Sequence, residues 1–198
     1  MAEIDVTRGD EPLVFQQGIE SFRKSLQQRL TPSLAAEVKA MGIDFERPAM
    51  AVSLATWEGV VGHIAGRLYP ELPEAERYFA LGRMFMLGYT QTTIGAAVLT
   101  LARIMGVRRT LHRMGKNFRT VANFIETEVT DQGPNQLQLA TWMRADLLAR
   151  HRRPTLIFAN YRRGVLQETL ALLGATGTVA VTESNLEKQR VVFSIQWQ

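Results

Sequence analysis

The sequence of 198 residues contains no cysteine. Disulfide bonds and thiolate ligands for metals are therefore excluded, and the composition suits a reducing compartment. Segment 1–10 lacks the basic and then apolar order of a secretory signal peptide, and we expect a disordered tail there. Three histidines are present, and no two of them have the spacing of metal ligands. We predict a cytoplasmic protein without a metal site.

Sequence signatures of catalysis are also missing. The chain has no glycine-rich phosphate loop, no nucleophile elbow and no pair of acidic residues on one predicted helix face. Its serines and threonines are not accompanied by a base at a suitable spacing. We therefore expect a protein that is not an enzyme.

No hydrophobic run has the length and purity of a membrane span. The longest, Tyr78–Met105, is interrupted by polar residues at 89–93 and carries two charges, Arg83 and Arg103. A surface helix needs a polar face, and this run has almost none. Its glycines and alanines allow another backbone to come close. We expect one or two helices here, buried against several partners.

The overall composition is that of an ordinary globular protein, with 46% hydrophobic and 21% charged residues. A length of 198 residues is enough for a substantial core, and we expect one domain at 11–198. The net charge is +4 and the sequence pI is about 9.8. This basic excess is too small to indicate nucleic-acid binding.

Apolar residues at helical spacing predict further helices around this run. Phe15, Ile19, Phe22 and Leu26 form one stripe. Thr31 and Pro32 have the sequence of an N-cap followed by the first helical residue. Further stripes run from Trp57 to Leu68 and from Val107 to Phe118, and the loop 43–52 lies before the first of these.

After about Val121 the apolar period changes from helical to two. Alternation around the turn 131–135 predicts a first hairpin, and alternation from Val179 to Trp197 predicts a second. A helix from Pro154 to about Leu173 separates them. We predict an α+β fold in which an N-terminal helical layer surrounds the buried run. The C-terminal order of hairpin, helix and hairpin predicts a four-stranded antiparallel sheet.

Several segments together resemble one family. They are Arg29–Pro32, Leu68–Pro73, Leu81–Gly82, Gly88–Thr92, Met114–Thr120, Gly164–Leu166 and a last apolar strand that ends at Trp197. The most specific are Gly-Tyr-x-Gln-Thr at 88–92 and Asn-Phe-Arg-Thr at 117–120. The sequence resembles a family of paralogous proteins of unknown function that is expanded in myxobacteria. The resemblance implies no catalytic residues.

The order of elements resembles a second, broader group. Helices followed by hairpin, helix and hairpin are similar to the fold of haem nitric-oxide sensors, four-vinyl-reductase-type sensor domains and the vesicle-tethering subunits that bind an acyl chain. That resemblance implies a hydrophobic pocket between helices and sheet, which holds a small ligand and reports its presence to a partner.

Aromatic and methionine side chains are the candidates to line such a pocket, because they suit adaptable apolar ligands. The candidates are Trp57, Phe85, Met86, Tyr89, Gln91 and Phe118. The alternative is that these residues only fill the core. Tyr89 and Gln91 place polar tips inside an apolar run, so each needs a hydrogen-bond partner from protein or ligand.

Haem is considered and not expected. The resemblance would put an axial ligand at His112, but the helical phase places this histidine nearer the polar side. The sensors also carry a Tyr-x-Ser-x-Arg motif, which segment 141–145 lacks. His63 falls opposite its apolar stripe and His151 lies among arginines, so we do not expect either to be a metal ligand. We expect no cofactor.

Two groups of basic residues remain. The first group is Arg108, Arg109, Arg113, Lys116 and Arg119. Within it, Arg109, Arg113 and Lys116 have the spacing of a solvated helix face. The second group is Arg150, Arg152 and Arg153, extended by Arg162 and Arg163. Such a cluster would suit a nucleotide-type anion or a protein partner.

The leading hypothesis is a non-catalytic small-molecule sensor or binding module, which forms a homodimer and acts on a protein partner. One alternative is a protein-interaction and dimerisation scaffold with a solid core. Another is a receptor for an anionic ligand at the second basic group.

Overall fold

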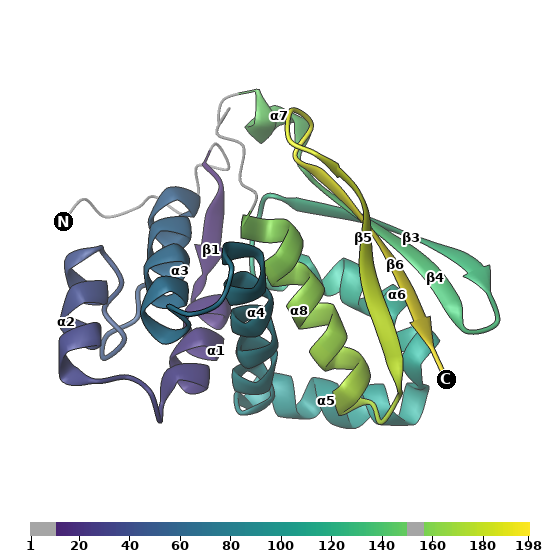
Figure 1. Cartoon of the computed structure of the whole chain (residues 1–198), viewed down its shortest axis with the longest axis horizontal. Coiled ribbons are helices and arrows are strands. Elements are labelled where there is room, and N and C mark those ends of the chain that lie inside the picture. Colours follow the sequence, from purple (N-terminus) through teal and green to yellow (C-terminus); the bar gives the residue numbers. More distant parts are fainter. Residues whose placement is uncertain (1–10, 150–156) are drawn as a thin grey trace.

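The computed structural model describes residues 11–149 and 157–198. The predicted tail at 1–10 and the predicted helix start at Pro154 lie outside these residues. The described elements form an α+β fold, as predicted, with the helices of the N-terminal half at one side and a sheet at the other (Figure 1).

The N-terminal part combines a small sheet with three helices. Strands β1 (Leu13–Phe15) and β2 (Ala51–Ser53) pair antiparallel. Helices α1 (Gln16–Leu26) and α3 (Leu54–Leu68) follow the predicted stripes, and α2 (Pro32–Ala40) begins at the predicted cap. The loop predicted at 43–52 is corrected, because its last two residues belong to β2. A strand of three residues is too short to show a period, and its pairing is long-range.

Helix caps follow the sequence signals. The Thr31 side chain accepts a hydrogen bond from the Leu34 amide at 3.2 Å, and Pro32 is the first residue of α2. The predicted stripe of α1 is confirmed, because Ile19, Phe22 and Leu26 are fully buried.

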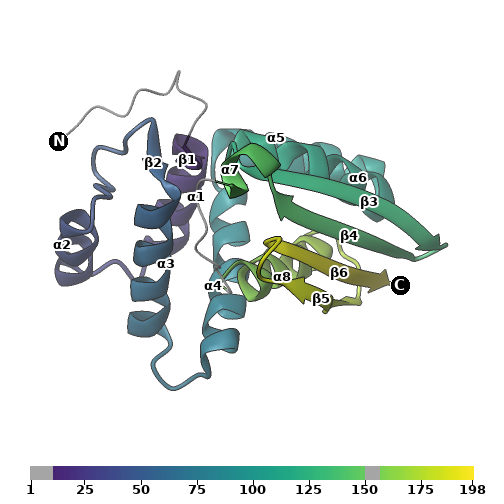
Figure 2. The same ribbon diagram turned by 90° about the horizontal axis from the view of Figure 1, so that it is seen from above.

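Helix α4 (Glu74–Thr90) is the centre of the molecule. Helix α1 packs against one side of it and α8 (Ile157–Leu172) against the other (Figures 1 and 2). The contacts are backbone to backbone. A Cβ atom added at Gly82 would lie 1.9 Å from the Tyr161 carbonyl oxygen, and one at Gly164 would lie 2.1 Å from the Phe79 carbonyl oxygen. Each helix thus presents a glycine where the other crosses it.

The second half of the apolar run is a separate helix, α5 (Thr93–Met105), and it is far less buried than predicted. Only Gly95 and Ala102 of α5 are buried. Helices α5 and α6 (Val107–Asn117) run across one end of the molecule (Figure 1), and the short 3-10 helix η1 (Phe118–Thr120) follows. The expectation that several partners surround the whole run is therefore wrong for α5.

The predicted C-terminal layer is confirmed. Strands β3 (Ile125–Gly133), β4 (Gln136–Met143), β5 (Gly177–Asn185) and β6 (Arg190–Trp197) form an antiparallel sheet in the order β3-β4-β6-β5. The short helix α7 (Ala145–Leu148) follows the first hairpin. Inward side chains of the sheet form a core with Leu111 of α6 and Leu166 and Leu170 of α8. Helices α6 and α8 therefore cover one face of the sheet.

Among the described helices, none is by itself long and apolar enough to cross a membrane. Only α4 and α5 taken together reach that length and apolarity, and the pair is bent by 95°.

The helix crossing gives a stability prediction. Gly164→Ala should lower the free energy of unfolding by about 3 kcal/mol, because the new methyl group meets a backbone carbonyl that has no room to move. Gly66→Ala in α3 is the matched control, since no atom lies within 4 Å of its added Cβ. The control should raise stability by about 0.5–1 kcal/mol. Urea denaturation of both variants measures the difference, and an equal effect in both would contradict the close crossing.

Candidate ligand-binding cavity

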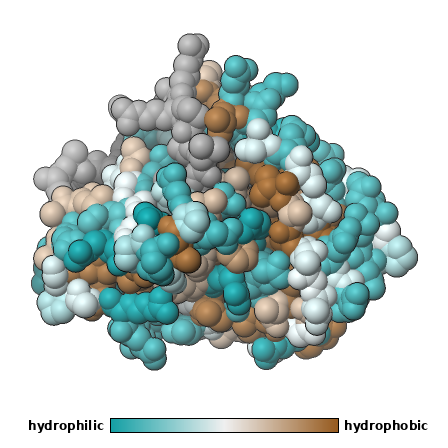
Figure 3. Space-filling model, in the orientation of Figure 1, coloured by the Kyte–Doolittle hydropathy of each residue, from teal (hydrophilic) through white to brown (hydrophobic). Residues whose placement is uncertain are grey.

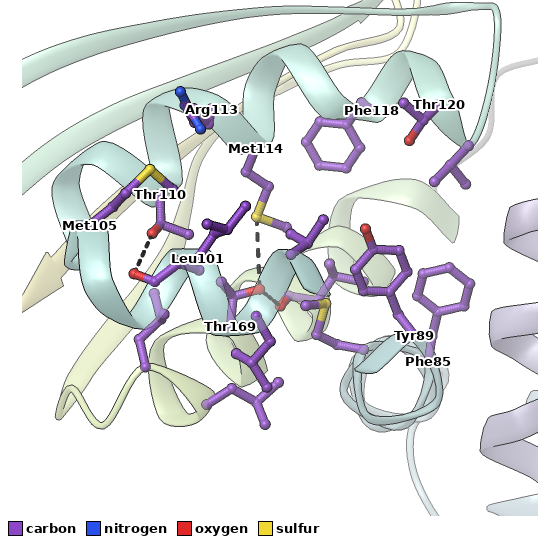
Figure 4. Close-up of a pocket in the computed structure, with 18 residues that line it drawn as sticks. Phe85, Tyr89, Leu101, Met105, Thr110, Arg113, Met114, Phe118, Thr120 and Thr169 are labelled. Carbon is purple, nitrogen blue, oxygen red and sulfur yellow. Dashed lines mark hydrogen bonds between the residues drawn. The ribbon is translucent and has the colours of Figure 1, made fainter. Parts of the chain in front are cut away.

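A cavity of about 140 Å³ lies among four helices. It is enclosed by α4, α5, α6 and α8, with η1 and the residue after it at one end (Figure 4). Its wall is almost entirely apolar. The lining residues are Phe85, Met86, Tyr89, Val98, Leu99, Leu101, Ala102, Met105, Thr110, Arg113, Met114, Phe118, Thr120, Val121, Val165, Thr169, Leu172 and Leu173.

Two buried threonines in the wall have their hydroxyl groups satisfied by protein. The Thr110 hydroxyl lies 2.8 Å from the Gly106 carbonyl oxygen and 3.1 Å from that of Ala102. The Thr169 hydroxyl donates to the Val165 carbonyl at 2.8 Å and lies 3.7 Å from the Met114 sulfur. Because these groups already have partners, they add little polarity to the cavity.

Tyr89 differs from these threonines. Its hydroxyl has no hydrogen-bond partner in the part of the chain that the structure describes. Figure 4 shows it pointing from α4 toward Phe118 and Thr120 on the opposite wall. Burial raises the pKa of this phenol above its ordinary value, so it is neutral at pH 7 and can donate a hydrogen bond. It is the polar group that a molecule in the cavity would meet.

The exposed members of the lining mark where the cavity meets the solvent. Leu101 of α5, Arg113 of α6 and Thr120 are all exposed, whereas Ala102 and Thr110 behind them are buried. In Figure 4 the head of Arg113 lies on the outer side of α6, away from the centre of the cavity. The opening is therefore beside α5 and α6.

Four of the six predicted pocket residues line this cavity: Phe85, Met86, Tyr89 and Phe118. Trp57 instead packs on Phe22 in the N-terminal core, with ring centroids 5.3 Å apart. Gln91 is the exposed C-cap of α4.

The position of the cavity also differs from the expectation. None of the described strands contributes a residue to its lining. Leu166 and Leu170 of α8 fill the space over the sheet, so the cavity lies within the helical layer rather than between helices and sheet. No pattern in the sequence identified the α8 lining residues Val165, Thr169 and Leu172, because only the tertiary fold brings α8 to α5. Ala102 and Met105 belong to the apolar run, but the sequence does not show that these two residues line a cavity.

The second basic group is not assembled as one surface in the described residues. Arg150, Arg152 and Arg153 lie outside those residues. Arg162 is buried and donates to the Thr141 hydroxyl at 2.7 Å, and burial lowers its pKa to about 10. Arg163 pairs with Glu76 at 2.9 Å and covers the Phe79 ring.

A family model described as a protein of unknown function (DUF2378) matches residues 13–198. The chain belongs to this family. The resemblance predicted from its segments is therefore confirmed over nearly the whole length. No curated protein matches the chain.

Solved structures of H-NOX domains have a similar fold. A doubly substituted Tt H-NOX domain is 11% identical with a TM-score of 0.68, and the match covers 93% of this chain and 95% of that one. An oxygen-binding H-NOX domain related to soluble guanylate cyclases is 10% identical with a TM-score of 0.66, over 92% and 94% of the two chains. An unliganded Fe(II) H-NOX variant from K. algicida is 8% identical with a TM-score of 0.60, over 93% and 97%. The predicted fold-level likeness is confirmed.

The residues of this chain do not fit a haem group. His112 does not line the cavity, and its ring nitrogen lies 3.4 Å from the Asp131 carboxylate at the surface. His63 pairs with Glu37 at 2.7 Å in the N-terminal part, and His151 lies outside the described residues. A cavity of 140 Å³ is close to the size that accepts benzene, about 150 Å³, and is too small for a macrocycle.

Filling the cavity tests its existence. Ala102→Leu should raise the free energy of unfolding by about 1 kcal/mol, because buried methylene groups replace empty space. Ala96→Leu on the exposed side of α5 is the matched control and should change stability by less than about 0.5 kcal/mol. Urea denaturation gives both values. A clear loss of stability in Ala102→Leu would show that the site has no room.

Tyr161 offers a second stability test beside the cavity. Its ring contacts Phe85 at a centroid distance of 5.6 Å, and its buried hydroxyl has no hydrogen-bond partner within residues 11–149 and 157–198. Tyr161→Phe should raise stability by about 1 kcal/mol or more, since it removes an unsatisfied polar group. Tyr69→Phe is the control, because Arg29 donates to that hydroxyl at 3.0 Å and no gain is expected. A loss of stability in Tyr161→Phe would reveal a partner.

Proposed function

We propose that this protein is a non-catalytic sensor or binding module for a small, neutral, largely apolar molecule. The proposal rests on the apolar cavity of about 140 Å³, in which the Tyr89 hydroxyl is the accessible hydrogen-bonding group. The H-NOX-like fold supports the proposal, since one of the similar structures is an oxygen-binding domain. That activity belongs to the relative, and the ligand class here is inferred from the wall of the cavity.

The dimensions and chemistry of the wall define the ligand class. Apolar cavities of about 150 Å³ accept benzene-sized molecules. Met86, Met105 and Met114 line the wall and can adapt to several shapes, because methionine side chains are flexible and polarisable. The proposed ligand is therefore a single ring or a short chain with one polar atom that reaches Tyr89.

Helix α5 is the element that would report occupancy. It lines the cavity with Val98, Leu99 and Met105, yet only two of its residues are buried. A ligand that fills the cavity adds contacts to the inner side of this helix and so favours one position of it. A protein partner that contacts α5 would sense the change.

The alternative of a scaffold with a solid core is disfavoured by the cavity itself. The anionic-ligand alternative relied on Arg150, Arg152 and Arg153, which the structure does not describe. The absence of catalysis, the homodimer and the cytoplasmic location stay predictions.

Binding of two probes of equal size tests the proposal. Toluene and phenol should each raise Tm by about 3 °C at ten times Kd, because a ligand of the folded state stabilises it. Tyr89→Phe should weaken phenol binding about fivefold, the equivalent of one lost hydrogen bond, and leave toluene unchanged. Calorimetric titration gives both affinities.

The cavity variants provide the control for this experiment. Ala102→Leu should abolish binding of both probes, and Ala96→Leu should bind both as the unmodified protein does. If neither probe shifts Tm, or if Ala102→Leu binds normally, the cavity is not a ligand site. If both probes bind as expected, mass spectrometry of an organic extract of the purified protein would identify the natural ligand.

A further inference from the structure

The acidic residues of this chain are distributed very unevenly. From Arg77 to Ile125 there is no aspartate or glutamate, while the same segment, Arg77 included, holds eight lysines and arginines. The rest of the chain has 15 basic residues against all 19 acidic ones. The modest net charge of +4 therefore hides a strongly basic segment, which comprises most of α4 and all of α5, α6 and η1.

Some of these cations are neutralised by other parts of the fold. Arg83 pairs with Glu168 at 2.7 Å, and Arg108 pairs with Asp131. In contrast, Arg109 and Arg113 of α6 and Arg119 of η1 are exposed, and no carboxylate in the described chain pairs with them. Arg103 of α5 is also exposed and donates to the Leu172 carbonyl at 3.3 Å. This end of the molecule carries cationic groups without counter-charges.

An exposed apolar row lies on α5. Ile94, Ala97, Leu101 and Ile104 follow one helix face and form what we call the α5 stripe. Ile104 is 79% exposed, Ile94 56% and Leu101 54%. Hydrophobic atoms reach the lower edge of the molecule in Figure 3, where Figure 1 places α5. Exposed isoleucines in a row are unusual on a protein surface that only meets water.

The α5 stripe and Arg113 meet at the mouth of the cavity. Leu101 and Arg113 line the same cavity, so the stripe runs beside α6 at its mouth. Arg109 lies one turn before Arg113 on the same side of α6. An apolar helix face next to arginines is the arrangement of helices that lie in the interface of an anionic bilayer, with the apolar side chains among the acyl chains and the cations at the headgroups.

We propose that this face docks onto an anionic lipid surface, with the α5 stripe inserted and Arg109 and Arg113 beside the lipid phosphates. A second copy of the chain is the poorer occupant. A two-fold symmetric contact would place this basic face against itself, and nothing acidic in the segment would offset the repulsion. A fluid lipid surface also needs no complementary groove to receive the exposed side of α5.

One consequence rests on the proposed function. Leu101 belongs both to the α5 stripe and to the exposed lining of the cavity, so the mouth lies at the edge of the stripe. A docked protein would therefore open its cavity toward the bilayer, where apolar molecules are concentrated. The ligand would enter from the lipid phase without crossing water.

Sedimentation with vesicles tests the docking. The full chain is mixed with vesicles of phosphatidylcholine alone or with about 30% phosphatidylglycerol, at about 50 and 300 mM salt. We expect binding to the anionic vesicles that falls at least tenfold at the higher salt, and at least tenfold weaker binding to phosphatidylcholine. Ile94→Ser with Ile104→Ser, and separately Arg109→Ser with Arg113→Ser, should each reduce the partition coefficient about tenfold or more.

Matched controls use exposed residues on other elements. Met50→Ser removes an exposed methionine and Arg47→Ser an exposed arginine, and both variants should bind vesicles as the unmodified chain does. Neither Ile94 nor Ile104 lines the cavity, so their variants should keep toluene binding. Conversely, Ala102→Leu should lose toluene and keep vesicle binding, which separates this proposal from the proposed function.

Several results would overturn the docking. One is no sedimentation with anionic vesicles at low salt. Another is equal binding to both vesicle types, or an equal loss in the Met50 and Arg47 controls. A third is a dimer in light scattering that the Ile94 and Ile104 substitutions dissociate while vesicles are not bound, because the α5 stripe would then serve a second copy.

Discussion

The contact between α4 and α8 is the constraint on which the remaining structure depends. Gly82 and Gly164 let the two backbones meet without side chains between them. All cavity residues contributed by these helices lie on the C-terminal side of the two glycines, from Phe85 on α4 and from Val165 on α8. The close crossing therefore holds α4 and α8 together at the two glycines, and the cavity lies beside the segments that follow them.

Helix α5 closes that space and differs from the other helices in having two apolar faces. One side of α5 lines the cavity and the adjoining exposed side carries the α5 stripe, with Leu101 belonging to both. A helix surface with so wide an apolar sector is normally buried. Both proposals follow from this exception. The cavity side of α5 can contact a bound ligand, and its exposed side can contact a lipid surface.

Much of the fold could be predicted from sequence, because periodicity records which side of an element is buried. The α1 stripe and both hairpins were recognised in this way, and Thr31 marked the start of α2 correctly. The burial of α5 could not be predicted, since an apolar run looks the same whether neighbours cover it or not. Of the pocket residues, those on α4 were found because they belong to that run. Trp57 was misassigned because it packs on Phe22 of α1, and chain order does not show which part of a core borders a cavity.

The outer face of α5 also has a meaning for how the sequence drifts over generations. Ile94 and Ile104 touch no core, so folding alone would tolerate serine, lysine or glutamate at either position. Substitutions at these two positions should therefore have little effect on stability. Whichever side chains are retained there are a record of the medium that this end of the protein meets.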